Sequence, residues 1–218
     1  MSIAQRIESI RQEIPPSVRL IAISKQVSVA KIREAYAAGI RDFGENRLQE
    51  ALSKQEELAD LPDICWHFIG HLQTNKAKKT LENFQWIHSV DNLALLQRLD
   101  RLAADLSTAP QICLQVKMLP DPNKYGWQIS ELLSHLSEIE ACQTVSIRGL
   151  MTILPLGLTP DEILSAFEST AKLARQIEQQ SSLRLTELSM GMSNDYLSAI
   201  AAGATMIRLG RTLFGERT

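Results

Sequence analysis

Short apolar segments rich in β-branched residues alternate with longer amphipathic segments along almost the whole sequence. This alternation constrains the fold more than any other feature, because strands separated by helices pair in parallel within one sheet. Eight such segments are predicted as strands, and the chain between them as helices. The predicted strands are Arg19–Ser24, Ile40–Phe43, Cys65–Ile69, Trp86–Ser89, Ile112–Val116, Val145–Leu150, Leu185–Ser189 and Thr205–Leu209.

Several of the predicted helices carry signals for where they begin and end. Thr159-Pro160-Asp161-Glu162 is a capping box with proline at the first helical position. Asp91 is predicted to cap the helix that starts near Leu93. Gly39 and Gly203 each precede a strand, where they can take the left-handed conformation that ends a helix.

Eight strand–helix units in a chain of this length favour a closed (β/α)₈ barrel over an open, doubly wound α/β sheet. The dinucleotide-binding alternative also lacks its fingerprint, since no Gly-x-Gly-x-x-Gly follows the first strand. We therefore expect residues 1–218 to form a single domain, with an extra amphipathic helix at the N-terminus. Its buried face is predicted to consist of Ile3, Ile7, Ile10 and Ile14.

Charge and cysteine usage exclude several classes of protein. The net charge of −2 gives no overall excess of basic residues for binding nucleic acid or an anionic membrane. The first helix is amphipathic rather than the apolar core of a signal peptide, and no apolar run approaches the roughly 20 residues that span a bilayer. The three cysteines, of which at least Cys65 and Cys113 lie in apolar runs, fit reduced thiols. The sequence predicts a cytoplasmic protein.

Lys25 directly follows the first predicted strand. In a barrel, functional groups gather at the C-terminal ends of the strands. A lysine there can project over the barrel mouth, where partial desolvation lowers the pKa of its amine and frees it to condense with a carbonyl. The alternative is an ordinary solvated lysine at a strand end, and position alone favours that alternative.

The segments after strands seven and eight resemble the recurrent phosphate site of this fold. Gly191 permits close backbone approach, and Ser193 is predicted to start a helix whose free N–H groups favour an anion. Gly210 and Thr212 follow the last strand. The competing interpretation is that Ser193 is only a helix cap and the glycines only turns.

Arg208 interrupts the apolar pattern near the end of the last strand. A buried guanidinium needs a partner, because an unpaired buried charge costs several kcal/mol. Two interpretations stay open. Arg208 pairs with a carboxylate such as Glu45 or Glu187, or it meets the ring nitrogen of a ligand.

Other polar residues near predicted strand ends are weaker candidates. His67 lies within Trp66-His67-Phe68, where a hydrogen-bonded core histidine is the commoner case. His67 and His71 would form a metal pair only on a helix, and the local composition indicates a strand and a turn, so no metal site is expected. The basic segment with Lys76, Lys78 and Lys79 is a solvated helix face or, as the alternative, a surface for an anion or a partner.

Taken together, these segments resemble the YggS/PROSC family of pyridoxal phosphate homeostasis proteins. The matching motifs run in order through almost the whole chain. They are Ile21–Lys25, Phe43–Asn46, Trp66–Lys76, Arg148–Met151, Ser189–Asp195, and Ile207–Gly210 with Phe214-Gly215.

The resemblance implies a barrel like the N-terminal domain of alanine racemases, with pyridoxal 5'-phosphate (PLP) linked to Lys25 as a Schiff base. It implies that Ser193, Gly210 and Thr212 hold the phosphate and that Arg208 faces the pyridine nitrogen. Asn46 is expected near the ring, and His67 and Met192 complete the expected cofactor-binding set.

The resemblance also implies a carrier of PLP that acts in cofactor homeostasis and amino-acid and keto-acid balance, without ordinary turnover. An arginine at the ring nitrogen weakens the electron sink that amino-acid chemistry needs. The second domain that supplies a catalytic tyrosine in racemases is not expected. PLP-dependent apoenzymes or regulatory proteins are candidate partners, and a monomer is expected. The alternatives are a PLP-dependent racemase or lyase, and a Schiff-base aldolase acting on a sugar phosphate.

Overall fold

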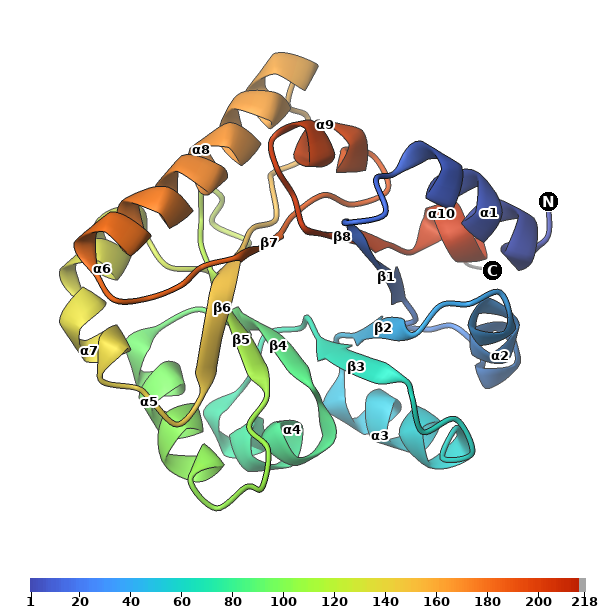
Figure 1. Cartoon of the computed structure of the whole chain (residues 1–218), viewed down its shortest axis with the longest axis horizontal. Helices are drawn as coiled ribbons and strands as arrows, with labels where there is room; N and C mark the ends of the chain where they lie inside the picture. The colour runs from blue at the N-terminus through green and yellow to red at the C-terminus, as the bar shows by residue number, and fades with distance from the viewer. Residues whose placement is uncertain (216–218) are drawn as a thin grey trace.

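The computed structural model, which describes residues 1–215, is a closed barrel of eight parallel strands surrounded by helices (Figure 1). The strands follow one another around the barrel in sequence order, and the last pairs with the first. The predicted (β/α)₈ barrel is confirmed. The last three residues of the predicted domain lie outside the described part of the chain.

All eight predicted strands are present, with ends displaced by at most a few residues. They are β1 Arg19–Ile23, β2 Asp42–Glu45, β3 Cys65–Phe68, β4 Trp86–Val90, β5 Gln111–Gln115, β6 Ser146–Met151, β7 Glu187–Ser189 and β8 Met206–Leu209.

The helices lie on the outside of the barrel (Figure 1). They are α1 Ile3–Glu13, α2 Val29–Ala37, α3 Leu48–Glu57, α4 Ala77–Asn83, α5 Leu93–Ala103, α6 Ile129–Ser134, α7 Leu136–Glu140, α8 Pro160–Gln180, α9 Tyr196–Ala201 and α10 Arg211–Phe214, with a short 3₁₀ turn at Thr74–Lys76. Within residues 1–215, no helix combines the length and the apolar character that crossing a membrane requires.

Most of the predicted helix starts and ends are confirmed. Thr159 and Glu162 form the predicted capping box of α8, and Gly39 and Gly203 have φ values of +90° and +96°. The predicted cap of α5 was wrong by one residue. Asn92, not Asp91, accepts the N–H of Leu95, because the Asp91 carboxylate is already bonded to the Asn92 amide and lies 3.2 Å from His71.

Helix α1 begins at the capping box of Ser2 and Gln5 and buries Ile3, Ile7 and Ile10. In Figure 1 it lies beside α10, so the first and last helices of the described chain are neighbours. The extra N-terminal helix is thus part of the outer layer of the barrel.

Two apolar layers fill the molecule. The larger layer lies between the strands and the helices. The smaller lies among the strands and contains Ile21, Ile23, Trp86, Cys113, Met151 and Met206. Polar side chains are also buried on the strands, among them His67, His88, Ser189 and Arg208. These polar residues depart from the branched apolar residues that usually fill such barrels.

Candidate cofactor site

A pocket of about 190 Å³ opens at the C-terminal ends of β1 and β8. It is lined by residues at the end of β1 and in the turn that follows it, in the loop after β6, and in the segments that follow β7 and β8. The lining is Ile23, Lys25, Leu154, Pro155, Leu156, Met192, Ser193, Asn194, Asp195, Arg208, Gly210 and Arg211. The pocket thus brings together five of the eight predicted site residues, which are Lys25, Met192, Ser193, Arg208 and Gly210.

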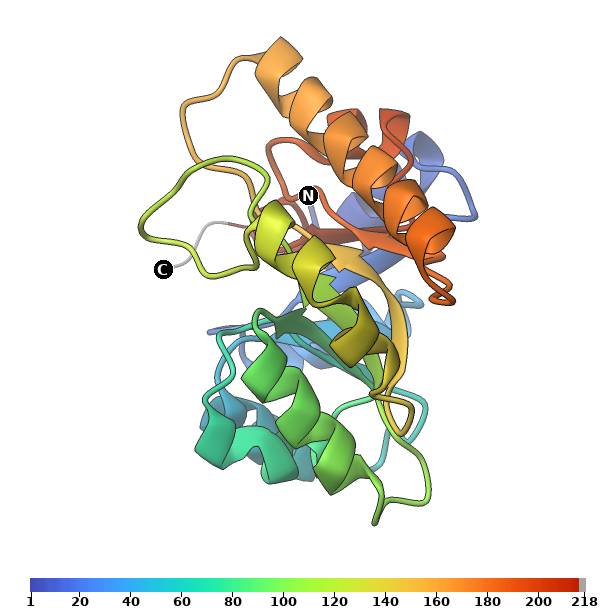
Figure 2. The ribbon, with the colours of Figure 1, turned by 90° about the vertical axis from the view of Figure 1, so that its left-hand side faces the viewer.

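The loops at this end differ in length. Figure 2 shows the loop between β5 and α6 and the loop between β6 and α8 projecting from the same end of the barrel. Leu154, Pro155 and Leu156 come from the second of these loops, and Leu156 is 88% exposed. This apolar wall was not predicted, since a loop residue has no periodicity to mark it.

The backbone on both sides of Lys25 is held in place. On one side, the Ser24 carbonyl accepts a hydrogen bond from Lys54 Nζ at 2.7 Å. On the other, the Gln26 N–H donates to Glu50 Oε1 at 2.5 Å. Gln26 has φ of 59°, a left-handed conformation that costs a non-glycine residue free energy. These bonds fix the turn that presents Lys25 to the pocket.

Lys54 joins this turn to a buried ion pair. Its Nζ lies 2.8 Å from Oε1 of Glu45 and 2.6 Å from Oε1 of Glu50. Burial raises the pKa of Glu45, although the hydrogen bonds from Lys54 and Ser24 oppose that shift. Glu45 therefore belongs to the support behind Lys25 and is not a partner of Arg208.

The segment after β7 forms a tight turn before α9. Gly191 has φ of +91°, and a Cβ at this position would lie 2.6 Å from the Ala199 side chain. The Met192 N–H donates to Asp195 Oδ1 at 2.5 Å, which closes the turn around Ser193. The prediction that Ser193 starts the helix was wrong, because α9 begins at Tyr196 and the Asp195 side chain holds the preceding turn instead.

Arg208 is 3% exposed and has neutral partners. Its Nη1 donates to Ser189 Oγ at 2.7 Å, and its Nη2 donates to the Thr152 carbonyl at 2.8 Å. Burial lowers the pKa of Arg208 to about 10, and the nearby Asp195 carboxylate partly offsets this. Neither predicted carboxylate pairs with it, since Glu187 is bonded to the Thr205 hydroxyl. The interpretation of Arg208 as half of a direct ion pair with Glu45 or Glu187 was wrong.

Three predicted site residues lie outside the lining of this pocket. Asn46 follows β2, where its carbonyl would lie 2.1 Å from a Cβ at Gly70. Thr212 is half-buried in the first turn of α10, close in sequence to Gly210. His67 is fully buried on β3. Their roles toward a cofactor stay predictions.

His67 is a hydrogen-bonded core histidine, as its sequence context indicated, and it takes part in a hydrogen-bonded series that was not predicted. It contacts Asp42 through Nε2 and His88 through Nδ1, and His88 in turn contacts Ser189. The only signal in the sequence was the occurrence of polar residues at inward positions of several strands, which does not reveal which of them meet.

Asp42, Cys65 and His67 also place three potential metal ligands within 4.8 Å of one another. The Asp42–His67 hydrogen bond and the guanidinium of Arg19, 3.9 Å from Asp42, account for this group without an ion. We assign no metal here.

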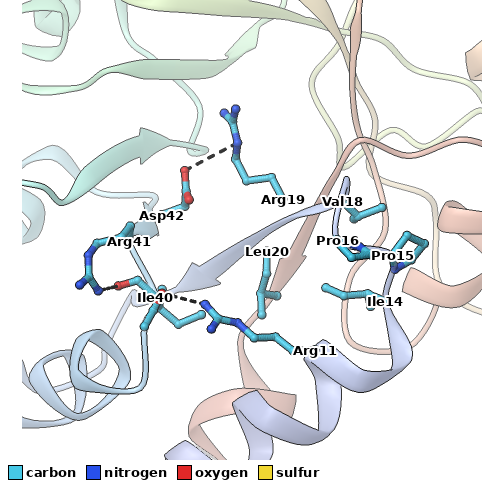
Figure 3. A pocket seen from close by; sticks show the side chains of 11 residues that line it. Arg11, Ile14, Pro15, Pro16, Val18, Arg19, Leu20, Ile40, Arg41 and Asp42 are labelled. Atoms are coloured by element: carbon cyan, nitrogen blue, oxygen red, sulfur yellow. Dashed lines mark hydrogen bonds and ion pairs between the residues drawn. The ribbon is translucent and has the colours of Figure 1, made fainter.

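A larger cavity of about 480 Å³ lies at the opposite end of the strands (Figure 3). Three arginines line it, but Arg11 donates to the Gly39 carbonyl and Arg41 is bonded to Asp63. In Figure 3, Arg19 and Asp42 point toward one another. Since barrels of this type carry their functional groups at the C-terminal ends of the strands, the smaller pocket is the better candidate site.

The chemistry of the smaller pocket fits a phosphorylated aldehyde. Lys25 supplies a primary amine, while Arg208 and Arg211 add positive charge against the single carboxylate of Asp195. Gly210 adds no side chain to this wall, where a Cβ would be in ordinary contact with Ile23 at 3.5 Å. An anionic group and a carbonyl can therefore be accommodated in one pocket.

Comparisons with known proteins point to one family. A family model described as the alanine racemase N-terminal domain matches residues 1–218. A pyridoxal phosphate homeostasis protein of Synechocystis sp. is 59% identical over 204 residues, which is 94% of each chain. Another, from Pseudomonas aeruginosa, is 43% identical over 203 residues, covering 93% of this chain and 86% of that protein.

Solved structures agree with the sequence comparisons. PipY of Synechococcus elongatus with PLP bound superposes with a TM-score of 0.95 at 55% identity, covering 98% of this chain and all of that one. PipY without PLP gives 0.96 at 57% identity, with the same coverage. Alanine racemase of Clostridium difficile shares the fold, with a TM-score of 0.80 at 12% identity over 99% of this chain and 56% of that one.

The order of the motifs, the closed barrel and these relatives all agree with the resemblance seen in the sequence. The chain belongs to the alanine racemase N-terminal domain family, among the members named pyridoxal phosphate homeostasis proteins.

Proposed function

We propose that this chain binds PLP as a Schiff base on Lys25 and serves PLP homeostasis as a carrier, without ordinary catalytic turnover. The observation that carries the proposal is the meeting of Lys25, Ser193 and Arg208 in one pocket. The PLP-bound structure of PipY, similar along almost the whole chain, supports the choice of ligand.

The predicted site residues have separate roles in this proposal. Lys25 condenses with the aldehyde, and Ser193 and Gly210 hold the phosphate at the turns after β7 and β8. Thr212, at the start of α10, assists them. Met192, Asn46 and His67 belong to the wider set of cofactor-binding residues, with Asn46 near the ring.

Arg208 is the reason to expect little turnover. PLP supplies an electron sink for amino-acid chemistry, and that sink is strongest when the pyridine nitrogen is protonated. A guanidinium facing the nitrogen disfavours that proton. Arg208 has no carboxylate in direct contact among residues 1–215, so its positive charge is available to act on the ring.

The carrier role also has consequences for the organisation of the protein and for its partners. We propose that residues 1–218 form one domain, that the protein is a cytoplasmic monomer, and that PLP-dependent apoenzymes or regulatory proteins receive the cofactor. The exposed Leu156 at the pocket wall is consistent with a site that exchanges its ligand.

A turnover assay tests the absence of catalysis. The PLP-loaded protein is incubated with common amino acids in deuterated water, and exchange at the α-carbon is followed by NMR. We expect exchange far slower than the roughly 1 per second at the lower end of usual enzyme turnover. Exchange at or above that rate, abolished by Lys25→Ala, would establish a racemase or lyase instead.

Borohydride trapping of the same protein distinguishes a PLP carrier from a Schiff-base aldolase. Protein that is colourless after incubation with PLP, and that forms a borohydride-stable adduct only with a sugar phosphate, would show that the amine serves a different carbonyl.

A further inference from the structure

A continuous series of side-chain hydrogen bonds crosses the interior of the barrel. Arg208 Nη1 lies 2.7 Å from Ser189 Oγ, and Ser189 Oγ lies 2.8 Å from His88 Nδ1. His88 Nε2 is then 2.8 Å from His67 Nδ1, and His67 Nε2 is 3.0 Å from Asp42 Oδ1. These five residues come from β8, β7, β4, β3 and β2.

The two ends of this series lie in different cavities. Arg208 lines the candidate cofactor pocket at the C-terminal ends of the strands. Asp42 is the first residue of β2 and lines the large cavity at the opposite end, where it faces Arg19 (Figure 3). Between them, His67, His88 and Ser189 are completely buried.

When both histidine rings are neutral, the chemistry of the two ends determines the direction of every hydrogen bond. A carboxylate only accepts, so His67 must donate to Asp42 from Nε2, and its Nδ1 must then accept from His88 Nε2. Nδ1 of His88 accepts in turn from the Ser189 hydroxyl. Ser189 remains free to accept from Arg208, which can only donate.

The surroundings of both histidines favour this neutral form. Burial lowers the pKa of His67, with Asp42 opposing the shift, and burial together with nearby positive charges lowers the pKa of His88 further. Aligned hydrogen bonds of this kind strengthen one another in a medium of low polarity. Reversing one bond would leave a buried donor facing a donor.

We infer that Asp42, His67, His88 and Ser189 are positioning residues for Arg208, which fix the direction of its guanidinium in the cofactor pocket and link it to a carboxylate at the other end of the barrel. The part of this inference that concerns the cofactor rests on the proposed function. The hydrogen-bond pattern itself belongs to the protein alone.

The first arm of the test uses wild-type protein without cofactor. Nitrogen-15 NMR of labelled histidines reports which ring nitrogen carries the proton. We expect His67 and His88 to be neutral and both protonated at Nε2. A proton on Nδ1 of either ring would overturn the inference, whether or not the protein binds PLP.

The second arm compares two matched variants, Asp42→Asn and Asp63→Asn. Both replace a carboxylate near the same end of the barrel, but Asp63 is bonded to Tyr36 and Arg41 and is not part of the series. We expect Asp42→Asn to shift the His88 resonances, to weaken PLP binding about ten-fold, and to displace the absorbance maximum of the bound cofactor. Asp63→Asn should leave all three unchanged.

Two further outcomes are decisive. An Asp42→Asn variant whose histidine resonances and bound-cofactor spectrum match those of wild type would show that Arg208 is positioned without the series. Wild-type protein that binds no PLP would overturn the proposed function instead, while the NMR arm would still decide the hydrogen-bond pattern.

Discussion

Lys25 owes its position to residues that hold the backbone on either side of it. Ser24 is bonded to Lys54 and Gln26 to Glu50, so the turn after β1 is fixed even though Gln26 takes a left-handed conformation. The sequence indicated Lys25 because it directly follows a strand. It did not indicate Lys54, because a lysine in the middle of an amphipathic helix usually faces solvent.

Removing Lys54 tests this support. We expect Lys54→Met to lower the free energy of unfolding by about 3–5 kcal/mol, because the buried Glu45 carboxylate loses its compensating charge. Urea denaturation followed by circular dichroism measures the loss. Lys79→Met, which replaces an exposed lysine, should change stability by no more than about 0.5 kcal/mol. A similar small effect for both variants would contradict a structural role for the ion pair.

Elements were predicted more reliably than their ends. The eight strands follow from apolar segments of the right length, and α8 from its capping box. Errors arose where two nearby polar side chains could each hold the start of a helix. Asp91 and Asn92 both can cap α5, and Ser193 and Asp195 both precede α9; the choice depends on contacts with distant residues such as His71.

Close approach of β6 and β7 depends on one glycine. A Cβ at Gly149 would lie 1.7 Å from the Glu187 carbonyl oxygen, which is backbone and cannot turn aside. We expect Gly149→Ala to destabilise the protein by about 3 kcal/mol or more, or to prevent folding, as judged by thermal unfolding. Gly157→Ala is the control. Gly157 has φ of +85° with open space around it, so the cost there should be only about 1 kcal/mol. Equal destabilisation by Gly149→Ala and Gly157→Ala would argue against a steric clash between a Cβ at position 149 and the Glu187 carbonyl.

At the scale of the whole molecule, the barrel itself was predictable because strand–helix alternation is a local property of the sequence. The hydrogen-bonded series from Asp42 to Arg208 was not, because its members come from five strands and meet only when the barrel closes. The polar positions were visible, but their pairing depends on register around the barrel.

Neutral buried histidines make stability depend on pH. The pKa of His67 and that of His88 are lowered in the folded state, so the unfolded chain binds more protons below its histidine pKa of about 6.5. The contribution of the two neutral histidines to the free energy of unfolding is fully present above about pH 6.5. It is lost as the pH falls toward the folded-state pKa values. Each histidine contributes a slope of up to about 1.4 kcal/mol per pH unit in that range.

Replacing His88 should make this dependence shallower. We expect the free energy of unfolding of His88→Gln, measured by urea titration between pH 5 and 7, to fall less steeply with decreasing pH than that of wild type. An unchanged slope in His88→Gln would mean that His88 is already protonated in the folded protein.

The central claim is that the amine of Lys25 bonds the aldehyde of PLP, and its most direct test is chemical. The protein is incubated with PLP, reduced with borohydride, digested and analysed by mass spectrometry. We predict that the phosphopyridoxyl group is found on Lys25, and that Lys25→Ala gives no reduced adduct at the pocket. Modification spread over exposed lysines such as Lys76, Lys78 and Lys79, with Lys25 unmodified, would contradict the account.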